Sequence, residues 1–460
     1  MLRSDKSVSS SAPTDAFDEA VVVDHPRRPA SPPAKTSLAL VGNFAPRKCG
    51  IATFTTDVFE QLGVHRPDIE TSVYALDEAD STVPHDPQAV ESLIDRHDPA
   101  SYAAASKAIN AAGTQAVWLQ HEYGIFGGTD GELVCDFVDA LAAPLILTPH
   151  TVLAEPSPSQ RRILTHLIRR ASRIMVMSYH ARDLLAEIYH APHEILEVIE
   201  HGAPDRPFGR QAQFKRQLGL EGRTILTTFG LLGPGKGLEQ VIEALPAIVA
   251  RHPHVIYRIV GATHPNLVAS HGEAYRDGLK ALAEKLGVAD NIAWDDRFLD
   301  TPELLDQLEA CDIYITPYPN LQQSTSGTLS YAVALGKAVI STPYLHAREL
   351  LANGIGAMIE PDNAAALSST VNRLLDDPEE MRALQQRAYA KGRETIWPRF
   401  AEAAAQLVQT AVADKSNTCA PPITVRAPAV DAVLAMSDAT GILQHSIGIV
   451  PDRRHGYCLD

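Results

Sequence analysis

Short apolar runs alternate with amphipathic segments along most of the chain. The run SLALVGNF, which begins at Ser37, is typical of a buried strand, and TFTTDVFEQL further on places apolar side chains at helical spacing. The alternation continues, and about seven strands fit between Ser37 and Gly202. Strands that alternate with helices in this way predict a parallel sheet that is covered on both faces.

The alternation starts again after a linking segment, APDRPFGRQAQF. A second unit opens at about Arg223 with the strand ILTTFGLL, and HVIYRIVG and DIYITPY supply further strands. We therefore predict an α/β protein with two Rossmann-like domains in tandem, facing each other across a cleft that holds the site. The predicted boundaries are 1–36 for a disordered N-terminal tail, 37–205 and 206–391 for the two domains, 392–412 for a C-terminal helix, and 413–460 for a linker and the segment after it.

A glycine-rich turn, GPGKG, joins a strand to a helix between Thr227 and Pro246. Glycines let the backbone approach an anion, the helix N-terminus presents free N–H groups, and Lys236 adds a positive charge. This combination is typical of a phosphate site. The alternative is an ordinary turn whose glycines serve only its backbone dihedrals.

Polar side chains stand at the ends of several strands of the first domain. The strand ends carry His121 and Glu122 in the first case, His150 and Thr151 in the second, Ser178 and His180 in the third, and His201 with Gly202 in the fourth. A histidine at a single strand end is more often a structural hydrogen-bonding group, but the ends of parallel strands gather on one face. We therefore expect this set to line a site. The histidine spacings match no zinc pattern, so no metal site is expected.

A second polar stretch lies in the second domain, where Ser326, Gly327 and Thr328 open a helix. Hydroxyls and a glycine at a helix N-terminus suit contact with a phosphate or a ribose. Simple helix capping is the alternative interpretation. The glycine-rich turn in the same domain favours ligand contact.

Composition narrows the class of protein. The chain has 460 residues and a net charge of −16, which disfavours a nucleic-acid binder because such proteins present a basic face. Its five cysteines are scattered without a C-x-x-C pair, as in a reducing compartment. No apolar run has the length of a membrane span, and the N-terminus lacks the basic and apolar segments of a secretory signal. We therefore expect a cytoplasmic protein.

From about Ser37 to Val412 the chain resembles a GT-B glycosyltransferase of family 4. The resemblance rests on the loop PRKCGIATFT and on the stretches FGLLGPGKGLEQVIEAL and GTLSYAVALGKAVIST. It implies a retaining transfer of a sugar from a nucleotide-sugar donor to a saccharide or small-molecule acceptor, with no cofactor and no essential metal. It also implies that the first domain is the acceptor side and the second domain the donor side.

The resemblance assigns roles to individual residues. Lys236 would stabilise the departing diphosphate, His150 would lie near the donor sugar, and His121, Glu122 and His150 are the candidates for assisting the acceptor hydroxyl. Gly50 matches the loop near the donor phosphates or the acceptor, and Glu349 matches a late family glutamate. The expected donor-binding residues are Gly50, Gly230, Gly233, Gly235, Gly237, Arg297, Gln323, Ser326, Gly327, Thr328, Tyr331 and Glu349.

The chain departs from the family pattern at two places. Leu231 stands where the family has an arginine, and Arg297 is a candidate for supplying the missing cation. Gln323 and Tyr331 stand where the family has two glutamates, one of which holds the donor ribose. These departures leave open a catalytically silent GT-B protein that binds a nucleotide or a glycan. A GT-B phosphorylase or epimerase is a further alternative.

The C-terminal part carries two more expectations. In GT-B folds the helix over 392–412 crosses back to the first domain. The segment LAMSDATGILQHSIGIVPDRRHGYCLD resembles the start of an α/α-barrel glycosidase-like domain. A segment this short cannot bury a core, so we expect it to be poorly ordered or merely docked. A partner protein could carry the missing part, and the alternative is a tail with no inherited role.

Overall fold

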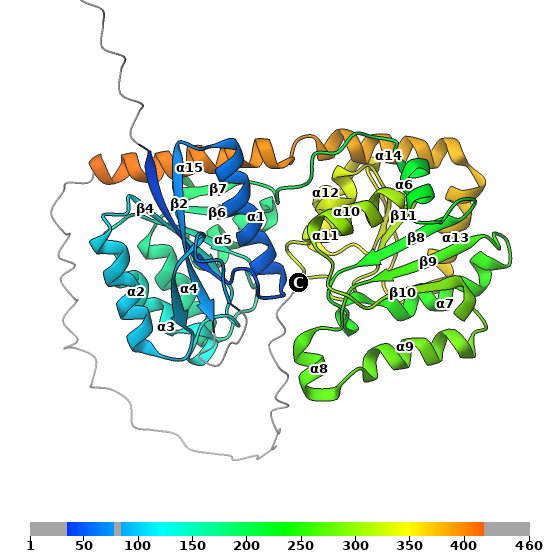
Figure 1. Ribbon diagram of the computed structural model, residues 1–460, viewed down its shortest axis with the longest axis horizontal. Coiled ribbons are helices and arrows are strands. Elements are labelled where there is room, and N and C mark those ends of the chain that lie inside the picture. Colours follow the sequence, from blue (N-terminus) through cyan, green and yellow to red (C-terminus); the bar gives the residue numbers. More distant parts are fainter. Residues whose placement is uncertain (1–34, 78–83, 418–460) are drawn as a thin grey trace, which may run out of the picture. The chain divides into compact units, whose positions relative to one another are not determined.

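The computed structural model describes residues 35–77 and 84–417, and their strands form two parallel sheets (Figure 1). The first is a seven-stranded sheet with the order β3-β2-β1-β4-β5-β6-β7 within these residues. Its strands are β1 (Thr36–Gly42), β2 (Ile69–Asp77), β3 (Val90–Asp95), β4 (Ala116–His121), β5 (Leu145–Pro149), β6 (Ala171–Val176) and β7 (Leu196–Val198). The α-helices between them are α1 (Gly50–His65), α2 (Pro99–Ala111), α3 (Leu133–Asp139), α4 (Pro158–Arg170) and α5 (Tyr179–Tyr189).

The second sheet has six strands among the described residues, in the order β10-β9-β8-β11-β12-β13. The strands are β8 (Thr224–Phe229), β9 (Val255–Val260), β10 (Ile292–Asp295), β11 (Ile313–Thr316), β12 (Ala338–Ser341) and β13 (Ala357–Met358). The accompanying helices are α6 (Gln211–Gln217), α7 (Leu238–Val249), α8 (Pro265–His271), α9 (Ala274–Lys285), α10 (Thr301–Ala310), α11 (Gly327–Ala334), α12 (Leu345–Leu350), α13 (Ala364–Asp376) and α14 (Pro378–Gly392).

Alternate residues of each strand face opposite sides of the sheet. In β1, Leu38 and Leu40 pack in a core with α1 and α15 (Trp397–Asn417), while Ala39 and Val41 pack in a core with α2, α3, α4 and α5. All four side chains are fully buried. Burial on both faces explains why β1 reads as a nearly continuous apolar run.

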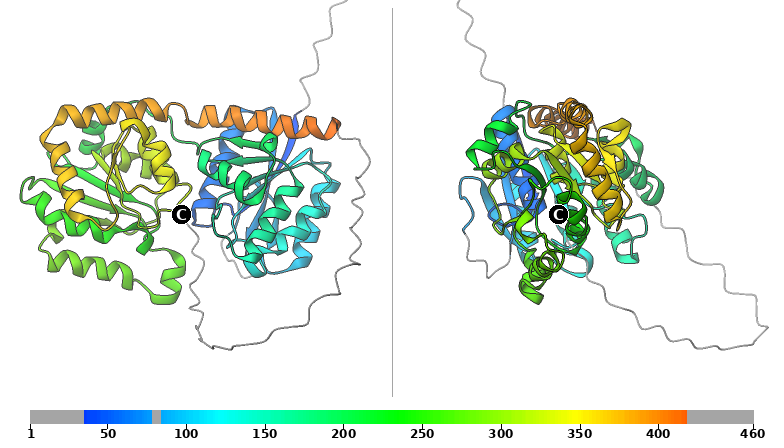
Figure 2. Two further views of the ribbon diagram at one scale, coloured as in Figure 1. Left: turned by 180° about the vertical axis from the view of Figure 1, so that it is seen from behind. Right: turned by 90° about the vertical axis from the view of Figure 1, so that its right-hand side faces the viewer.

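The last helix, α15, packs against α1 and the first sheet although it follows the second sheet in the chain (Figure 2). Its Trp397, Phe400 and Ala404 share a core with Leu38 and Phe54. An apolar stripe on this long helix therefore covers one face of the first sheet.

Both sheets have the strand order of a Rossmann domain, in which the direction of winding reverses beside the first strand. The reversal lies between β1 and β4 in the first sheet and between β8 and β11 in the second sheet. The predicted class, α/β with two Rossmann-like domains, is confirmed. The reversal matters for function because ligands bind outside the strand ends at this point.

Some elements and boundaries differ from the sequence prediction. The edge strand β3 lacks the continuous apolar run that identifies a buried strand in the sequence. Its Ile94 is buried, whereas Leu93 is 50% exposed. In α10, buried Gln307 and Glu309 interrupt the apolar stripe that would reveal a helix. β1 begins inside the predicted tail, and α15 continues past residue 412. Most of the predicted tail (1–34), most of the predicted linker and the glycosidase-like segment (434–460) lie outside the described residues.

Candidate active site

A cavity of about 660 Å³ lies at the carboxyl ends of strands from both sheets. The segments that follow β1, β7, β8, β9 and β10 line it, together with parts of α1, α10 and α11. This is where open α/β sheets bind ligands, and the volume is within the range of small-molecule sites. We refer to this cavity as the central pocket.

One wall of the central pocket is a polar face of α1. Thr53, Thr56, Asp57 and Glu60 follow one another at spacings of three, one and three residues and all line the pocket. Val58, on the opposite side of the helix, is fully buried in the core. Residues three and four apart on a helix share a face, so this wall presents two hydroxyls and two carboxyl groups.

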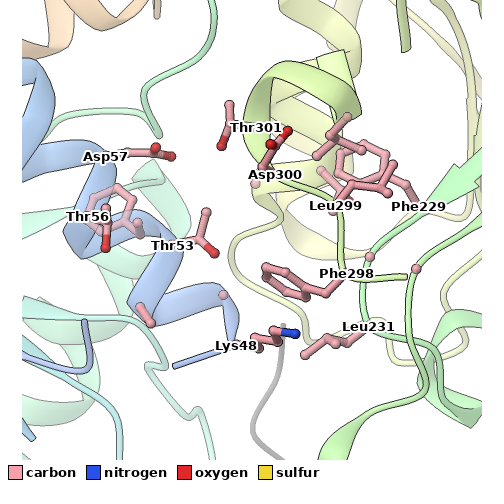
Figure 3. A pocket seen from close by; sticks show the side chains of 18 of the residues that line it. Lys48, Thr53, Thr56, Asp57, Phe229, Leu231, Phe298, Leu299, Asp300 and Thr301 are labelled. Atoms are coloured by element: carbon pink, nitrogen blue, oxygen red, sulfur yellow. The ribbon is translucent and has the colours of Figure 1, made fainter. Parts of the chain in front are cut away.

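The opposite wall follows strands of the second sheet. Leu231 follows β8, and Phe298, Asp300 and Thr301 follow β10, as Figure 3 shows. The Nζ of Lys48, in the loop before α1, lies 5.8 Å from the centroid of the Phe298 ring. This is a cation–π contact across the pocket. The ring of Phe298 is 38% exposed and adds apolar surface.

A hydrogen bond joins the two walls. The Tyr331 hydroxyl, on α11, donates to Asp57 Oδ2 at 2.8 Å. Burial raises the pKa of Asp57 to about 7, although the hydrogen bond from Tyr331 acts in the opposite direction. Burial also raises the pKa of Tyr331, so its hydroxyl keeps its proton. The phenol is therefore the hydrogen-bond donor of this pair, and the carboxyl group of Asp57 changes its charge near neutral pH.

His201 also lines the central pocket, and its ring has room there because residue 327 is a glycine. Its Nδ1–H donates to the Gly202 carbonyl at 2.7 Å, which leaves Nε2 as the acceptor nitrogen. A Cβ on Gly327 would lie 2.8 Å from that Nε2. The ring packs against Phe54 and Tyr331, and burial lowers its pKa to about 4. His201 is therefore neutral at physiological pH.

Lys236 lies behind the pocket wall. Its side chain is buried, and Nζ donates to the Tyr318 hydroxyl at 3.0 Å. That hydroxyl is 3.1 Å from Thr328 Oγ1, and Thr328 lines the pocket. A Cβ on Gly230 would lie 3.5 Å from Nζ, so the ammonium lies close to the backbone of Gly230, which lines the pocket.

The other glycines of the turn do not reach the pocket lining. Gly237 has φ +62°, and a Cβ there would lie 2.2 Å from the Pro317 carbonyl oxygen. A Cβ on Gly233 would touch Leu267, whereas Gly235 has open space around it. The turn thus needs glycine at Gly237 for close backbone packing. The pocket lining is reached just before the turn, by Gly230 and Leu231.

Of the polar residues predicted at strand ends, His201 lines the pocket. His121, Glu122, His150, Thr151, Ser178 and His180 lie outside the lining. His150 Nε2 is 3.0 Å from Gln120 Oε1, and its ring packs edge-on to Phe54, which does line the pocket. Both ring nitrogens of His121 lack a hydrogen-bond partner among the described residues. Burial lowers the pKa of both histidines to about 3. Glu122 accepts from the Tyr123 backbone N–H at 2.9 Å, and burial raises its pKa.

Two predicted donor-binding residues are engaged in local structure. Ser326 caps α11, since its Oγ accepts from the Leu329 N–H at 3.3 Å, as the capping alternative expects. Gln323 Nε2 donates to the Thr325 carbonyl at 3.0 Å. Neither residue lines the pocket in this structure.

Two predicted charged residues make ion pairs or caps. Arg297 lines the pocket, but its guanidinium bonds to Asp295 at 2.8 Å and Glu303 at 2.6 Å, so its charge is largely balanced. Glu349 lies away from the pocket lining and accepts from the backbone N–H groups of Tyr179 at 2.9 Å and His180 at 2.5 Å. It therefore caps α5.

The predicted residues divide into two groups by position. Those in the pocket lining are Gly50, His201, Gly230, Arg297, Gly327, Thr328 and Tyr331. The lining also contains Thr53, Asp57 and Phe298, which the motifs do not single out. The helical spacing of polar residues in TFTTDVFE is a signal that could have indicated the α1 wall.

Among the described residues, His, Cys, Asp and Glu side chains nowhere gather in a group of three that could hold a metal ion. Within the same part of the chain, no helix combines the length and the apolar character needed to cross a membrane.

The fold and the position of the pocket define a GT-B protein. Anabaena Alr3699/HepE, solved in complex with UDP, has a TM-score of 0.66 and 16% sequence identity, over 82% of this chain and 100% of that chain. Sucrose-phosphate synthase from Thermosynechococcus elongatus has a TM-score of 0.67 and 16% identity, over 83% of this chain and 100% of that chain. These similarities establish the fold.

Residues 210–391 match the family of glycosyl transferases group 1, which confirms the resemblance inferred from the motifs. The D-inositol 3-phosphate glycosyltransferase of Thermobispora bispora is 26% identical over 284 residues, 58% of this chain and 65% of the relative. The enzyme of the same name from Rhodococcus jostii is 25% identical, over 57% of this chain and 60% of the relative. The chain thus aligns with less than two thirds of the length of these relatives.

Proposed function

We propose that this chain transfers a sugar, with retention of anomeric configuration, from a nucleotide-sugar donor to a saccharide or small-molecule acceptor. The observation that carries this proposal is the central pocket of about 660 Å³, which has the group 1 segment on one side and α1 on the other. The names of the matched relatives support sugar transfer, and the UDP in the Anabaena complex supports a nucleotide-sugar donor.

In the proposed reaction Lys236 stabilises the departing diphosphate. Its ammonium lies close to the backbone of Gly230, and the hydroxyls of Tyr318 and Thr328 connect it to the pocket. The N-terminus of α1 at Gly50 and the side chain of Lys48 add positive potential to the same pocket. These groups would offset the diphosphate charge without a cofactor or an essential metal.

The acceptor hydroxyl would approach from the α1 side of the pocket. His150, His121 and Glu122 were the candidates for assisting it, but none of them lies in the pocket lining. Of the ionisable groups that do line the pocket on this side, Asp57 is buried and its pKa lies near neutrality. It is therefore better placed to contact a hydroxyl group of a ligand.

A catalytically silent binder is the second candidate function. Its support is that Gln323 and Tyr331, which replace the family's glutamates, are both engaged with other residues of the chain. Leu231 in the pocket wall also offers no charge to a diphosphate. Such a protein would bind a nucleotide or glycan in the same pocket and release no product.

A donor screen distinguishes the two candidates. The full chain is first screened by thermal shift against UDP, GDP and ADP and their common sugar conjugates, because a ligand of the folded state raises the apparent stability. Donors that bind are then incubated with candidate acceptors, and nucleoside diphosphate release and product anomeric configuration are measured. Release that disappears in Lys236→Ala but persists in Lys285→Ala, an exposed lysine on α9, supports transfer.

Binding without release under every acceptor condition would favour the silent binder. A product of inverted configuration would overturn the retaining mechanism. We further propose a cytoplasmic location for the protein. A partner that carries the rest of a glycosidase-like domain stays a prediction from the sequence of residues 434–460.

A further inference from the structure

The carboxyl group of Asp57 has one engaged oxygen and one open oxygen. Oδ2 accepts the Tyr331 hydroxyl at 2.8 Å. Oδ1 has no hydrogen-bond partner among the described residues, although the side chain is only 7% exposed and lines the central pocket. Figure 3 shows the carboxyl group directed across the pocket toward Thr301. A ligand in the pocket can therefore reach Oδ1.

The hydroxyls of the same helix face complement this oxygen. Thr53 Oγ1 donates to the Cys49 carbonyl at 3.2 Å, so it is left as an acceptor for a ligand. Thr53 and Asp57 are one helical turn apart, which places their Cβ atoms about 5–6 Å from each other. Two acceptors at this spacing suit a ligand that donates from two adjacent hydroxyl groups.

The carboxyl groups around Asp57 disfavour a phosphate group at this part of the wall. Asp57 and Glu60 lie on the α1 face, and Asp300 lies on the opposite wall. Among the described residues Asp57 forms no ion pair, and Glu60 interacts with it unfavourably. Arg47, Lys48 and the N-terminus of α1 lie at the other end of the helix, about 10 Å away at 1.5 Å per residue. The fourth positive group in the lining, Arg297, is paired with Asp295 and Glu303.

We propose that Asp57, fixed by Tyr331 and assisted by Thr53, binds a vicinal diol of the ligand in the central pocket. The diol is either the ribose of the nucleotide or a pair of hydroxyls of the saccharide. This inference rests on the proposed function for its ligand class. It assigns the diol-binding carboxylate to α1, which forms the pocket wall opposite the group 1 segment.

The cost of burying Asp57 argues for a role in binding. A buried carboxyl group without a cation destabilises the fold, and an amide would accept the Tyr331 hydrogen bond without that cost. A carboxylate forms stronger hydrogen bonds to hydroxyl donors than an amide does. A purely structural role therefore gives no reason for an acid at this position.

Binding through Asp57 is expected to weaken at low pH. The groups that face it are Glu60 on α1, Tyr331 on α11 and, against Tyr331, His201. Burial keeps the pKa of Tyr331 high and lowers that of His201 to about 4, so neither changes charge between pH 5.5 and 8. Asp57 has a pKa of about 7 and does change charge in this interval.

The test measures affinity for matched probes by calorimetric titration of the full chain at pH 8 and pH 5.5. The first arm compares UDP, GDP and ADP with their 2′-deoxy and 3′-deoxy forms. The second arm compares myo-inositol and methyl glycosides with singly deoxygenated analogues. The variants are Asp57→Asn, which keeps the acceptor for Tyr331, and Tyr331→Phe, with Glu187→Gln, an exposed carboxyl group on α5 outside the pocket lining, as the control.

We expect loss of one hydroxyl to weaken binding to the wild type about tenfold or more in one arm, as for a hydrogen bond to a charged group. Asp57→Asn should remove that discrimination, pH 5.5 should reduce it, and Tyr331→Phe should reduce it partly. The responsive arm identifies the source of the diol. Affinities within twofold of wild type for Asp57→Asn in both arms, or no binding of any probe, would overturn the proposal.

The outcome is separable from that of the proposed function. If the wild type discriminates hydroxyl from deoxy probes through Asp57 but releases no nucleoside diphosphate with any acceptor, the transferase proposal fails and the diol site stands. If transfer is observed and Asp57→Asn leaves probe discrimination intact, the transferase proposal stands and the diol site fails.

Discussion

The ammonium of Lys236 donates to the hydroxyl of Tyr318 at 3.0 Å, and also lies 4.6 Å from the centroid of the same ring. The contact fixes the buried cation close to the backbone of Gly230, at the edge of the central pocket. A fixed charge is more effective in catalysis than a mobile one, because it need not reorganise as charge develops on the leaving group.

We predict that Lys236→Ala lowers the rate of sugar transfer by about 10² to 10³, as for loss of one preorganised donor. Tyr318→Phe keeps the ring but removes the hydroxyl, so it should have a smaller effect in the same direction. Steady-state nucleotide release measures both variants, with Lys285→Ala as the control. Full activity of a folded Lys236→Ala variant would show that the diphosphate is stabilised elsewhere.

Gly327 is predicted to tolerate no side chain. A Cβ there would lie 2.8 Å from His201 Nε2, and the His201 ring cannot move freely because it packs against Phe54 and Trp397. Gly327→Ala should lower the free energy of unfolding by about 1–3 kcal/mol through overpacking, and should weaken ligand binding. Urea denaturation and calorimetric titration measure the two effects.

Gly235 provides the matched control for Gly327. It belongs to the glycine-rich turn, but a Cβ there would meet no atom within 4 Å. Gly235→Ala should therefore leave ligand affinity unchanged and alter stability little. A large loss of affinity in Gly235→Ala would instead indicate that a ligand approaches this turn closely, as the motif predicted.

The sequence predicts the fold and part of the pocket for clear physical reasons. The apolar runs of β1 and β8 are visible because parallel strands are buried on both faces. Gly230, Gly327 and Thr328 were identified because turns and helix starts have local signatures. Local signals of this kind extend over a few residues along the chain.

The remainder of the site depends on contacts between distant segments. Asp57 owes its hydrogen-bond partner to Tyr331, which is 274 positions away in the chain. Lys236 is directed toward Tyr318, 82 positions away, and this contact places its ammonium behind the wall. His121 and His150 stand at strand ends as predicted, but the pocket wall is formed by other residues. Periodicity and motif spacing carry no information on such pairings.

Glu349 is predicted to contribute to stability through its contact with α5. Its carboxylate accepts from the backbone N–H groups of Tyr179 and His180 in the first turn, while Ser178 Oγ accepts from the third N–H, of Ala181. A negative charge at a helix N-terminus is stabilising, so Glu349→Gln should lower the free energy of unfolding by about 0.3–1 kcal/mol. Urea denaturation measures the change.

The control for Glu349 is Glu187→Gln, which removes an exposed carboxyl group from the same helix α5 and should change stability less. Nucleotide affinity should be the same in both variants, because Glu349 is not in the pocket lining. A tenfold loss of affinity in Glu349→Gln at unchanged stability would support the donor contact that the family resemblance implies.

Asp57 is predicted to make the stability of the protein fall as pH rises from 4 to 7. In the unfolded chain its pKa is ordinary, whereas burial raises it to about 7 in the folded state. Over this interval the folded state keeps a proton that the unfolded state has lost, so the free energy of unfolding decreases with pH. Three pKa units correspond to a penalty on the order of 4 kcal/mol above pH 7.

Asp57→Asn removes this penalty while keeping an oxygen that accepts from Tyr331. The variant should therefore be more stable than the wild type at pH 8, by up to the full penalty, and should differ little at pH 4. Urea denaturation of both proteins across this pH range measures the difference. Glu187→Gln, an exposed change on α5 outside the pocket lining, should leave this pH dependence unchanged. If the wild type and Asp57→Asn show parallel stability curves, the Asp57 carboxyl group titrates in the folded protein as it does in the unfolded chain.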